Sequence, residues 1–388
     1  MPLHRMHNPV QNYQWGSKTL FKQYLGFENK DEKPQAELWM GAHEKAPSQI
    51  NEQGSLIPLN SYLEEKKESL PFLFKVLAVD QPLSIQAHPT KKQAEKGFAE
   101  EEKQGVPRTA GNRNYKDDNH KPELICAYTD FTALRGFRSN KEIAENFQNF
   151  QVQDYLLTDL QGLKNGGAKE LKHFFKSLID IEENGKKRLL NKVINYSNQH
   201  VTEPEAQLVL KLAEKYPGDI GIVSPYLLKM AVLQPGEAMY LPAGVLHCYI
   251  SGLGVEIMAN SDNVLRGGLT VKHVDKEELL SVLSFEEGDF PVIKPIDARD
   301  GRKIYRSEAP EFQLEKIGVL EDAPITIKTQ GLQSIYLCME GKLEIRSGDN
   351  KLTMSPGDSV YQSSEEKEVT FTGTGLVFRG TLPNTEKK

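Results

Sequence analysis

Residues that could bind a metal ion lie in three separate segments. Gln86 and His88 stand two apart in "LSIQAHP". Glu123 begins the apolar run of "KPELICAY", and His247 alternates with apolar residues in "PAGVLHCYI". Residues two apart on a β-strand face the same side, so Gln86 and His88 would point in one direction. The spacing by itself favours hydrogen-bonded polar residues in a core. The alternative is a metal site of two imidazoles, a carboxylate and an amide oxygen, which suits Zn²⁺ and leaves room for substrate.

A second candidate cluster lies in "SDNVLRGGLTVKH". Arg266 precedes two glycines, and Lys272 follows shortly after them. A guanidinium and an ammonium beside glycines can hold a phosphate-like anion or a developing oxyanion. The other interpretation is a solvated turn. Glu256, in "LGVEIMAN", alternates with apolar neighbours and could point inward, where a carboxylate must be paired or bound to a metal.

Short β-strands are expected to position these residues. Strands are predicted at 71–79, 83–88 and 121–128, and His247 and Tyr249 are expected to face a barrel interior. A Pro-Gly-acid turn occurs twice, in "PGEAMYLPAG" (235–244) and "SPGDSVYQSS" (355–364). This repetition suggests two copies of a small β-barrel or jelly roll. The second copy has no histidine after its turn, so it is expected to keep the fold without the chemistry.

The region 139–217 has a helical pattern instead. Ser139 with Glu142, and Thr202 with Glu205, match the capping box that opens a helix. Between them, one predicted helix face carries five apolar residues, which are Leu171, Phe174, Phe175, Leu178 and Ile179. Three or four amphipathic helices are expected here, as an insertion into a β structure.

The predicted fold class is therefore mainly β with an α insertion. We expect a discontinuous β-barrel domain that carries the candidate site, formed by residues 1–138 with 218–295. A helical insertion would occupy 139–217, and a C-terminal β domain of the same kind would occupy 296–388.

Composition narrows the possible partners and location. The 388 residues carry a net charge of −6 with no basic stripe, so no nucleic acid partner is expected. No apolar run approaches the ~20 residues of a membrane span, and the N-terminus lacks the apolar segment of a signal peptide. Cys126, Cys248 and Cys338 are unpatterned, which indicates buried free thiols in a reducing cytoplasm. Nothing in the sequence indicates an obligate interface, so a monomer is expected.

The chain resembles a known family, the type I mannose-6-phosphate isomerases, which are zinc enzymes of the cupin superfamily. Eight segments occur in the order of that family: "YQWGS", "AELWMGAHEKAPS", "PFLFKVL", "LSIQAHP", "YKDDNHKPEL", "ALRGFR", "PAGVLHCY" and "SDNVLRGGLTVKHVD". The chain is similar to the long form of the family, which has a helical insertion and a C-terminal cupin-like domain.

The resemblance implies one zinc ion per chain, bound by Gln86, His88, Glu123 and His247, and it implies that Arg266 is an active-site residue. The implied reaction interconverts D-mannose 6-phosphate and D-fructose 6-phosphate through a cis-enediol(ate). This reaction would feed mannose into glycolysis or supply precursors for mannosylated polymers such as those made from GDP-mannose.

Other roles follow from the chemistry of this reaction. An arginine stays protonated, so a different residue must carry the proton, and Glu256 and Lys121 are the candidates. Lys75, Ser84 and Lys272 are candidates for binding the phosphate. Two further classes remain open, a non-haem iron oxygenase and a non-catalytic sugar-binding cupin.

The remaining conspicuous side chains are expected to be structural. Trp15 and Trp39 are interpreted as packing residues rather than pocket walls. His43 has no ligand-like company and is expected to have a surface or core role.

Overall fold

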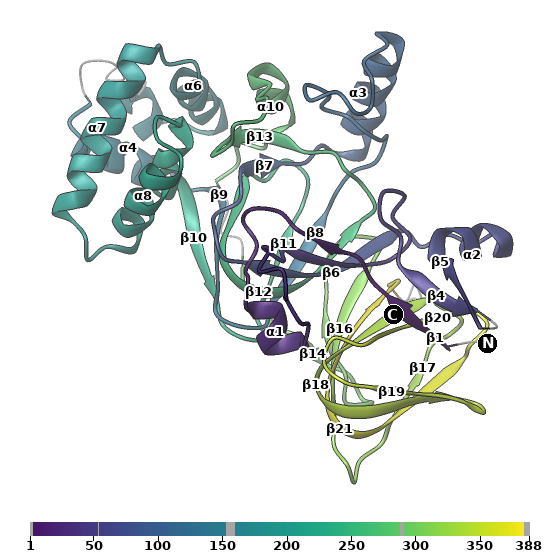
Figure 1. Ribbon diagram of the computed structural model, residues 1–388. Coiled ribbons are helices and arrows are strands. Elements are labelled where there is room, and N and C mark those ends of the chain that lie inside the picture. The colour runs from purple at the N-terminus through teal and green to yellow at the C-terminus, as the bar shows by residue number, and fades with distance from the viewer. Residues whose placement is uncertain (1–2, 53, 153–159, 288–290, 384–388) are drawn as a thin grey trace.

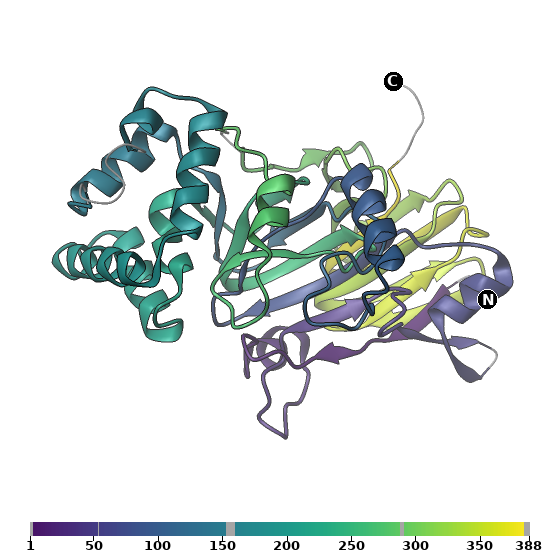
Figure 2. The same ribbon diagram turned by 90° about the horizontal axis from the view of Figure 1, so that it is seen from above.

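The fold has three parts that follow one another across the molecule. The structure is a computed structural model that describes residues 3–52, 54–152, 160–287 and 291–383. A group of helices forms one end, an antiparallel β-sheet lies in the middle, and the C-terminal strands form the other end (Figures 1 and 2). This arrangement confirms the predicted class, a β-rich protein with a helical insertion.

The middle sheet has ten strands and is organised around β12. This long strand pairs with β6, β7, β8 and β9. The strands of the sheet are β2 (Val10–Gln11), β3 (Glu37–Met40), β6 (Phe72–Val79), β7 (Ile85–Ala87), β8 (Glu123–Ala127), β9 (Phe131–Phe137), β10 (Leu228–Leu233), β11 (Ala238–Leu241), β12 (His247–Ala259) and β13 (Leu265–Gly268). Because one strand reaches so many partners, segments far apart in the sequence meet along it.

The second sheet has eleven strands and combines both ends of the chain. Its central strands β18 and β21 pair over most of their length, and β1 pairs with β20 through His4 and Tyr361. The strands are β1 (Leu3–His7), β4 (Gln49–Glu52), β5 (Ser55–Pro58), β14 (Ile296–Asp297), β15 (Lys303–Tyr305), β16 (Gln313–Val319), β17 (Ile325–Lys328), β18 (Ser334–Ser347), β19 (Asn350–Met354), β20 (Ser359–Gln362) and β21 (Glu368–Thr381). Parts of the N-terminal 138 residues thus belong to the sheet of the C-terminal region.

The helices gather mainly in the insertion. They are α1 (Leu20–Leu25), α2 (Leu59–Lys66), α3 (Lys91–Lys103), α4 (Asn140–Asn149), α6 (Ala168–Ile179), α7 (Glu183–Gln199), α8 (Pro204–Lys215), the 3₁₀ helix η1 (Ile220–Val223), α9 (Ser224–Leu227) and α10 (Lys276–Val282). The five apolar residues predicted to share one face of α6 are all buried. They pack in one core with the outer face of β7, β12 and β13.

A side-chain cap explains where helix α4 begins. The Ser139 hydroxyl accepts a hydrogen bond from the Glu142 N–H at 3.2 Å, as predicted, and the Glu142 carboxylate accepts one from Ser139 N at 3.0 Å. The second predicted capping box was wrong. Helix α8 begins at Pro204 without a side-chain cap, and Glu205 instead pairs with Arg138 at 2.7 Å. That carboxylate pairs with the partly exposed side chain of Arg138 and not with the start of the helix.

Alternation along β12 and β7 decides which side chains face inward. Leu246, Cys248 and Ile250 pack toward the helical insertion, and Tyr249 packs in the interior core of the barrel. Ile85 and Ala87 also face the helices, and β7 is shorter than the predicted strand because it ends before His88. The predicted inward direction of the polar residues is therefore confirmed.

The repeated turn has the same geometry in both sheets. The Glu237 carboxylate accepts a hydrogen bond from Gln234 N at 3.0 Å, and Asp358 accepts one from Ser355 N at 2.9 Å. Each turn is followed by a strand, β11 in the first sheet and β20 in the second. The two sheets thus share the local design that the sequence repetition indicates.

Two further predictions concern cysteines and membrane spans. All three cysteines are buried and make no disulfide. Among the described residues, each helix is too short or too polar to span a bilayer.

Candidate active site

Two histidines and a glutamate meet at the inner end of the middle sheet. His88 Nε2 lies 3.4 Å from Glu123 Oε1, and His247 Nε2 lies 3.3 Å from Glu123 Oε2. The ligand atoms of the three residues lie within 4.8 Å of one another, and all three side chains are buried. They come from β8, from the first residue of β12 and from the residue after β7.

Backbone carbonyls fix the tautomers of both imidazoles. His88 Nδ1 donates to the carbonyl of Asn263 at 2.7 Å, and His247 Nδ1 donates to the carbonyl of Val245 at 2.9 Å. A carbonyl can only accept, so each Nδ1 carries a hydrogen, which in a neutral ring leaves the lone pair on Nε2. This arrangement is the usual outer support of metal-binding histidines.

The charges of the cluster suit a cation. Burial, together with the nearby Lys121 ammonium, lowers the pKa of His88 to about 4, so this imidazole is neutral at pH 7. Burial would raise the pKa of Glu123, but Lys121 Nζ at 2.9 Å and the two imidazoles hold that pKa well below its usual range. The site therefore combines an ionised carboxylate with the neutral imidazole of His88.

The residues fit a divalent metal because their ligand atoms are otherwise unsatisfied. Within the described part of the chain, His88 Nε2, His247 Nε2 and Glu123 Oε2 are buried and make no hydrogen bond. Buried polar atoms normally find partners, so three that converge without one fit a bound cation. Gln86 sits opposite His247 in the strand register and lines the adjoining cavity, which places its amide beside the cluster.

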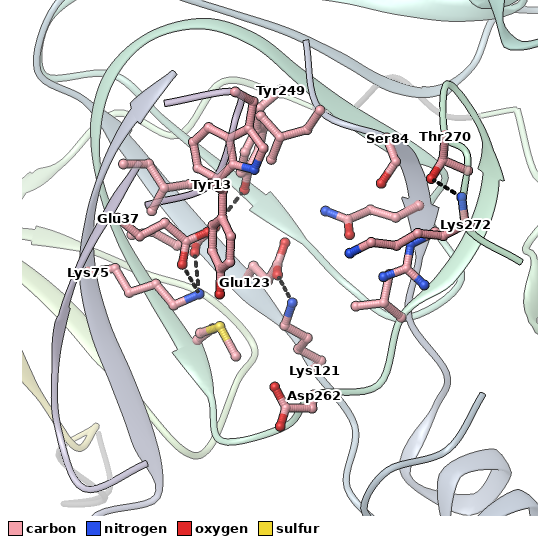
Figure 3. A pocket seen from close by; sticks show the side chains of 18 of the residues that line it. Tyr13, Glu37, Lys75, Ser84, Lys121, Glu123, Tyr249, Asp262, Thr270 and Lys272 are labelled. Atoms are coloured by element: carbon pink, nitrogen blue, oxygen red, sulfur yellow. Dashed lines mark hydrogen bonds and ion pairs between the residues drawn. The ribbon is translucent and has the colours of Figure 1, made fainter. Parts of the chain in front are cut away.

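A cavity of about 680 Å³ opens beside the cluster (Figure 3). Eight of the predicted site residues line it, namely Lys75, Ser84, Gln86, Lys121, Glu123, Glu256, Arg266 and Lys272. His88 and His247 lie behind the wall, each 1% exposed. The structure thus brings all ten predicted residues to one place.

One wall of the cavity holds a buried group of charges on β3, β6 and β12. Lys75 Nζ lies 3.4 Å from Glu37 and 3.5 Å from Glu256, and Tyr249 donates its hydroxyl to Glu256 at 2.9 Å. Burial, reinforced by Glu123, raises the pKa of Glu256 to about 7, although Lys75 opposes this rise. Burial would lower the pKa of Lys75, but the two carboxylates raise it above its usual value. Glu256 can therefore exchange a proton near neutral pH, which suits a general base.

The opposite wall carries cations and hydroxyls. Figure 3 shows Ser84, Thr270 and Lys272 across the cavity from Glu37 and Lys75. Arg266 lies opposite Gln86 in the register of β13 and β7, and both residues line the cavity. Arg266 is therefore next to a candidate metal ligand. Burial lowers the pKa of Arg266, and burial together with Arg266 lowers that of Lys272. Two cations placed close together at a cavity wall form an attractive site for an anion.

Comparison with known proteins identifies the family. The type I phosphomannose isomerase catalytic domain matches residues 3–140, and the helical insertion domain of that family matches residues 140–228. Mannose-6-phosphate isomerase of Escherichia coli (strain K12) is 38% identical over 391 residues, which cover 97% of this chain and 99% of that protein. The chain belongs to the type I phosphomannose isomerase family.

Other phosphomannose isomerases support this membership. The Rattus norvegicus mannose-6-phosphate isomerase is 33% identical, covering 95% of this chain and 96% of its own. The Salmonella typhimurium enzyme, solved with fructose 6-phosphate and zinc, is 36% identical with a TM-score of 0.92, covering 99% of this chain and all of that one. The similarity spans the whole fold and not only the site.

Several cavity residues of this phosphomannose isomerase family member were not predicted from the sequence. Glu37 and Trp39 both line the cavity, and Trp39 donates its indole N–H to Glu37. His43 also lines it and lies 3.6 Å from Asp262, a position that the sequence did not indicate. The packing interpretation of the tryptophans was incomplete, because Trp15 lines the cavity too. The period-two spacing of Glu37 and Trp39 was an available signal, whereas Asp262 lies in a loop without any periodic pattern.

Proposed function

We propose that this chain is a zinc-dependent aldose–ketose isomerase that interconverts D-mannose 6-phosphate and D-fructose 6-phosphate. The observation that carries the proposal is the convergence of three unsatisfied metal-ligand atoms beside a cavity with a cationic wall. Membership of the phosphomannose isomerase family supports it, as does the related structure bound to fructose 6-phosphate and zinc. Both findings argue against an iron oxygenase and against a non-catalytic cupin.

Zinc would be held by His88, Glu123 and His247, with the amide oxygen of Gln86 as the fourth ligand. A zinc ion in such an open site stabilises negative charge on substrate oxygens. The ammonium of Lys121 donates to Glu123 at 2.9 Å, so its proposed part is to keep this carboxylate ionised and in position.

Proton transfer is assigned to Glu256. Starting from the aldose, this carboxylate takes the proton from C2, and the electron pair left behind forms the C1–C2 double bond. The electrons of the C1 carbonyl move to O1, which gives a cis-enediolate. Return of the proton to C1, with transfer of the O2 proton to O1, completes the ketose. The pKa of Glu256 near 7 and its hydrogen bond from Tyr249 support this role.

The cationic wall is assigned to the anionic parts of the substrate. Arg266 would stabilise the developing enediolate oxygen with its guanidinium N–H groups. Pairing of β13 with β7 holds its backbone opposite Gln86, beside the proposed metal site. Lys272 and Ser84 would bind the phosphate on the same side of the cavity. Lys75, predicted as a third phosphate ligand, lies between two carboxylates on the other wall, so we assign it to the control of Glu256.

Removal of the metal tests the proposal. Protein treated with a chelator should lose isomerisation of mannose 6-phosphate, measured as fructose 6-phosphate formation, and stoichiometric Zn²⁺ should restore it. Oxygen uptake measured in the same samples distinguishes an oxygenase. Full isomerisation by protein shown to be free of metal would refute the zinc assignment, and zinc-loaded protein without isomerisation would refute the function.

Several coarser features complete the proposal. The substrate is a small sugar phosphate, and we propose that a monomer acts on it, which size-exclusion chromatography with light scattering would test. The buried unpaired cysteines support a reducing cytoplasmic location. We also propose that the chain has three functional parts. They are a catalytic part (1–138 with 218–295), a helical insertion (139–217) and a C-terminal part (296–388).

A further inference from the structure

The loop after β13 forms the rim of the cavity and has an unusual backbone conformation. Leu269 has φ +54°, in the left-handed region that leucine rarely adopts, and its side chain is buried. Thr270 and Lys272 line the active-site cavity, whereas the side chain of Val271 is fully exposed. A bulky residue is strained in this conformation, which persists only where neighbouring groups enforce it.

Packing alone does not hold the loop. A second cavity, of about 640 Å³, lies on its other side, between the loop and the segment that connects α8 to η1. Gly268 and Val271 line this second cavity, so the loop has open space on both faces. Arg266 and Lys272 also carry like charges that repel one another when no anion is bound. These features favour displacement of the loop unless a specific contact opposes it.

Asp219 provides such a contact from the end of the helical insertion. Its Oδ1 accepts hydrogen bonds from Leu269 N at 2.9 Å and from Gly221 N at 2.7 Å, and its Oδ2 accepts one from Thr270 N at 3.2 Å. One carboxylate therefore binds both peptide groups at the strained turn and also its own 3₁₀ helix.

Two glycines make this close approach possible. A Cβ atom at Gly268 would lie 3.0 Å from Asp219 Oδ1, and one at Gly221 would lie 2.9 Å from Leu269 N. Both distances are shorter than ordinary van der Waals contact, so larger residues would separate the loop from Asp219. The contact thus depends on the backbone of both segments and not on a flexible surface side chain.

We propose that Asp219 is a positioning residue, through which the helical insertion holds the Leu269–Lys272 loop against the sugar-phosphate site. This inference rests on the proposed function. Arg266 is fixed separately, because β13 pairs with β7 at Gln86. Asp219 is therefore expected to act on substrate binding through Lys272 and to leave the proton-transfer step nearly unchanged.

The test compares Asp219→Asn and Asp219→Ala with Asp358→Asn. Asp358 accepts a hydrogen bond from Ser355 N in a turn of the C-terminal sheet, far along the chain from the loop, so it controls for the general cost of losing a capping carboxylate. For both Asp219 variants we expect KM for mannose 6-phosphate to rise about tenfold or more, with kcat within about threefold of the parent and zinc content unchanged. The inhibition constant of inorganic phosphate should rise by a similar factor.

Amide hydrogen exchange provides a readout that does not depend on activity. Peptides covering 265–273 should exchange faster in the Asp219 variants, and peptides of the C-terminal sheet should not. Asp219→Asn keeps one acceptor oxygen and should show a smaller effect than Asp219→Ala. Unchanged KM and phosphate inhibition in folded, zinc-loaded variants would overturn the proposal, as would an equal rise in KM in Asp358→Asn. If the parent protein lacked isomerase activity, the proposed function would fail, whereas unaltered exchange in the loop would refute the role of Asp219 itself.

Discussion

Replacement of Lys75 by methionine tests how the buried charges set the proton-transfer group. Lys75 Nζ lies 3.5 Å from the Glu256 carboxylate, and the two side chains are 7% and 3% exposed. With an effective dielectric constant of about 20, Coulomb's law gives an attraction of about 5 kcal/mol at this distance, which corresponds to roughly three pKa units. Relaxation and entry of water reduce the effect, so we expect the pKa of Glu256 to rise by about two units in Lys75→Met.

The expected kinetic result has a defined sign. A general base is active when ionised, so kcat/KM should increase with pH through the pKa of Glu256, about 7 in the parent. In Lys75→Met the acidic limb should move to higher pH by about two units. The rate at pH 7 should then fall about 50-fold and recover near pH 9–10. The measurement is kcat/KM for mannose 6-phosphate from pH 5.5 to 10.

Two controls separate this effect from other consequences of the change. Lys75→Arg keeps the positive charge and should keep the acidic limb near that of the parent. Removing one partner of a buried pair costs about 3–5 kcal/mol, so folding and zinc content must be verified for each variant. An acidic limb in Lys75→Met that coincides with the parent would refute the reasoning. If KM instead rose equally at every pH, Lys75 would act as a phosphate ligand, which was the role predicted from the sequence.

Further predictions concern the cationic wall, the metal ligands and the insertion. Arg266→Ala should lower kcat by about 10²–10³-fold while zinc stays bound, as measured by steady-state kinetics and metal analysis; unchanged turnover would remove Arg266 from the mechanism. Gln86→Glu should keep zinc but lower turnover, because a charged ligand makes the metal less electron-poor, and unaltered zinc affinity and turnover would exclude this role for the amide. Phe174→Ala should lower the free energy of unfolding by about 3–5 kcal/mol in urea titrations without changing zinc content, since Phe174 is fully buried and packs edge-on against Phe147 at 5.1 Å.

Local periodicity predicted the direction of site residues wherever they lie on strands. His247 and Tyr249 face inward because β-strands alternate strictly, and the same rule placed Gln86 on the cavity side. It also predicted the apolar face of α6, where residues three and four apart are neighbours. These predictions depend only on the spacing of residues within a single helix or strand, so the sequence was sufficient to make them.

Residues in loops and at element ends could not be placed in this way. Asp262 and Asp219 reach the site through long-range contacts that have no local signature, and Asp219 meets Leu269 across 50 positions. The predicted capping box at Thr202 was wrong for a related reason, because the Glu205 carboxylate pairs with Arg138, which lies in a distant segment of the chain. Pairing of β1 with β20 joins residues about 350 positions apart, so the sequence offered no means of assigning β1 to the second sheet.

The two β-sheets differ in how their buried charges are balanced. In the C-terminal sheet the buried Glu315 accepts from Arg302 at 2.8 Å and from Arg379 at 3.1 Å, so its charge is balanced by the fold itself. In the middle sheet His88, His247 and Glu123 face one another with ligand atoms that lack hydrogen-bond partners in the described structure. The first network has its charges paired by the protein itself, whereas converging ligand atoms without partners fit a bound cation. Shared turn geometry therefore indicates a common β design, and the difference in charge balance locates the candidate metal site in the middle sheet.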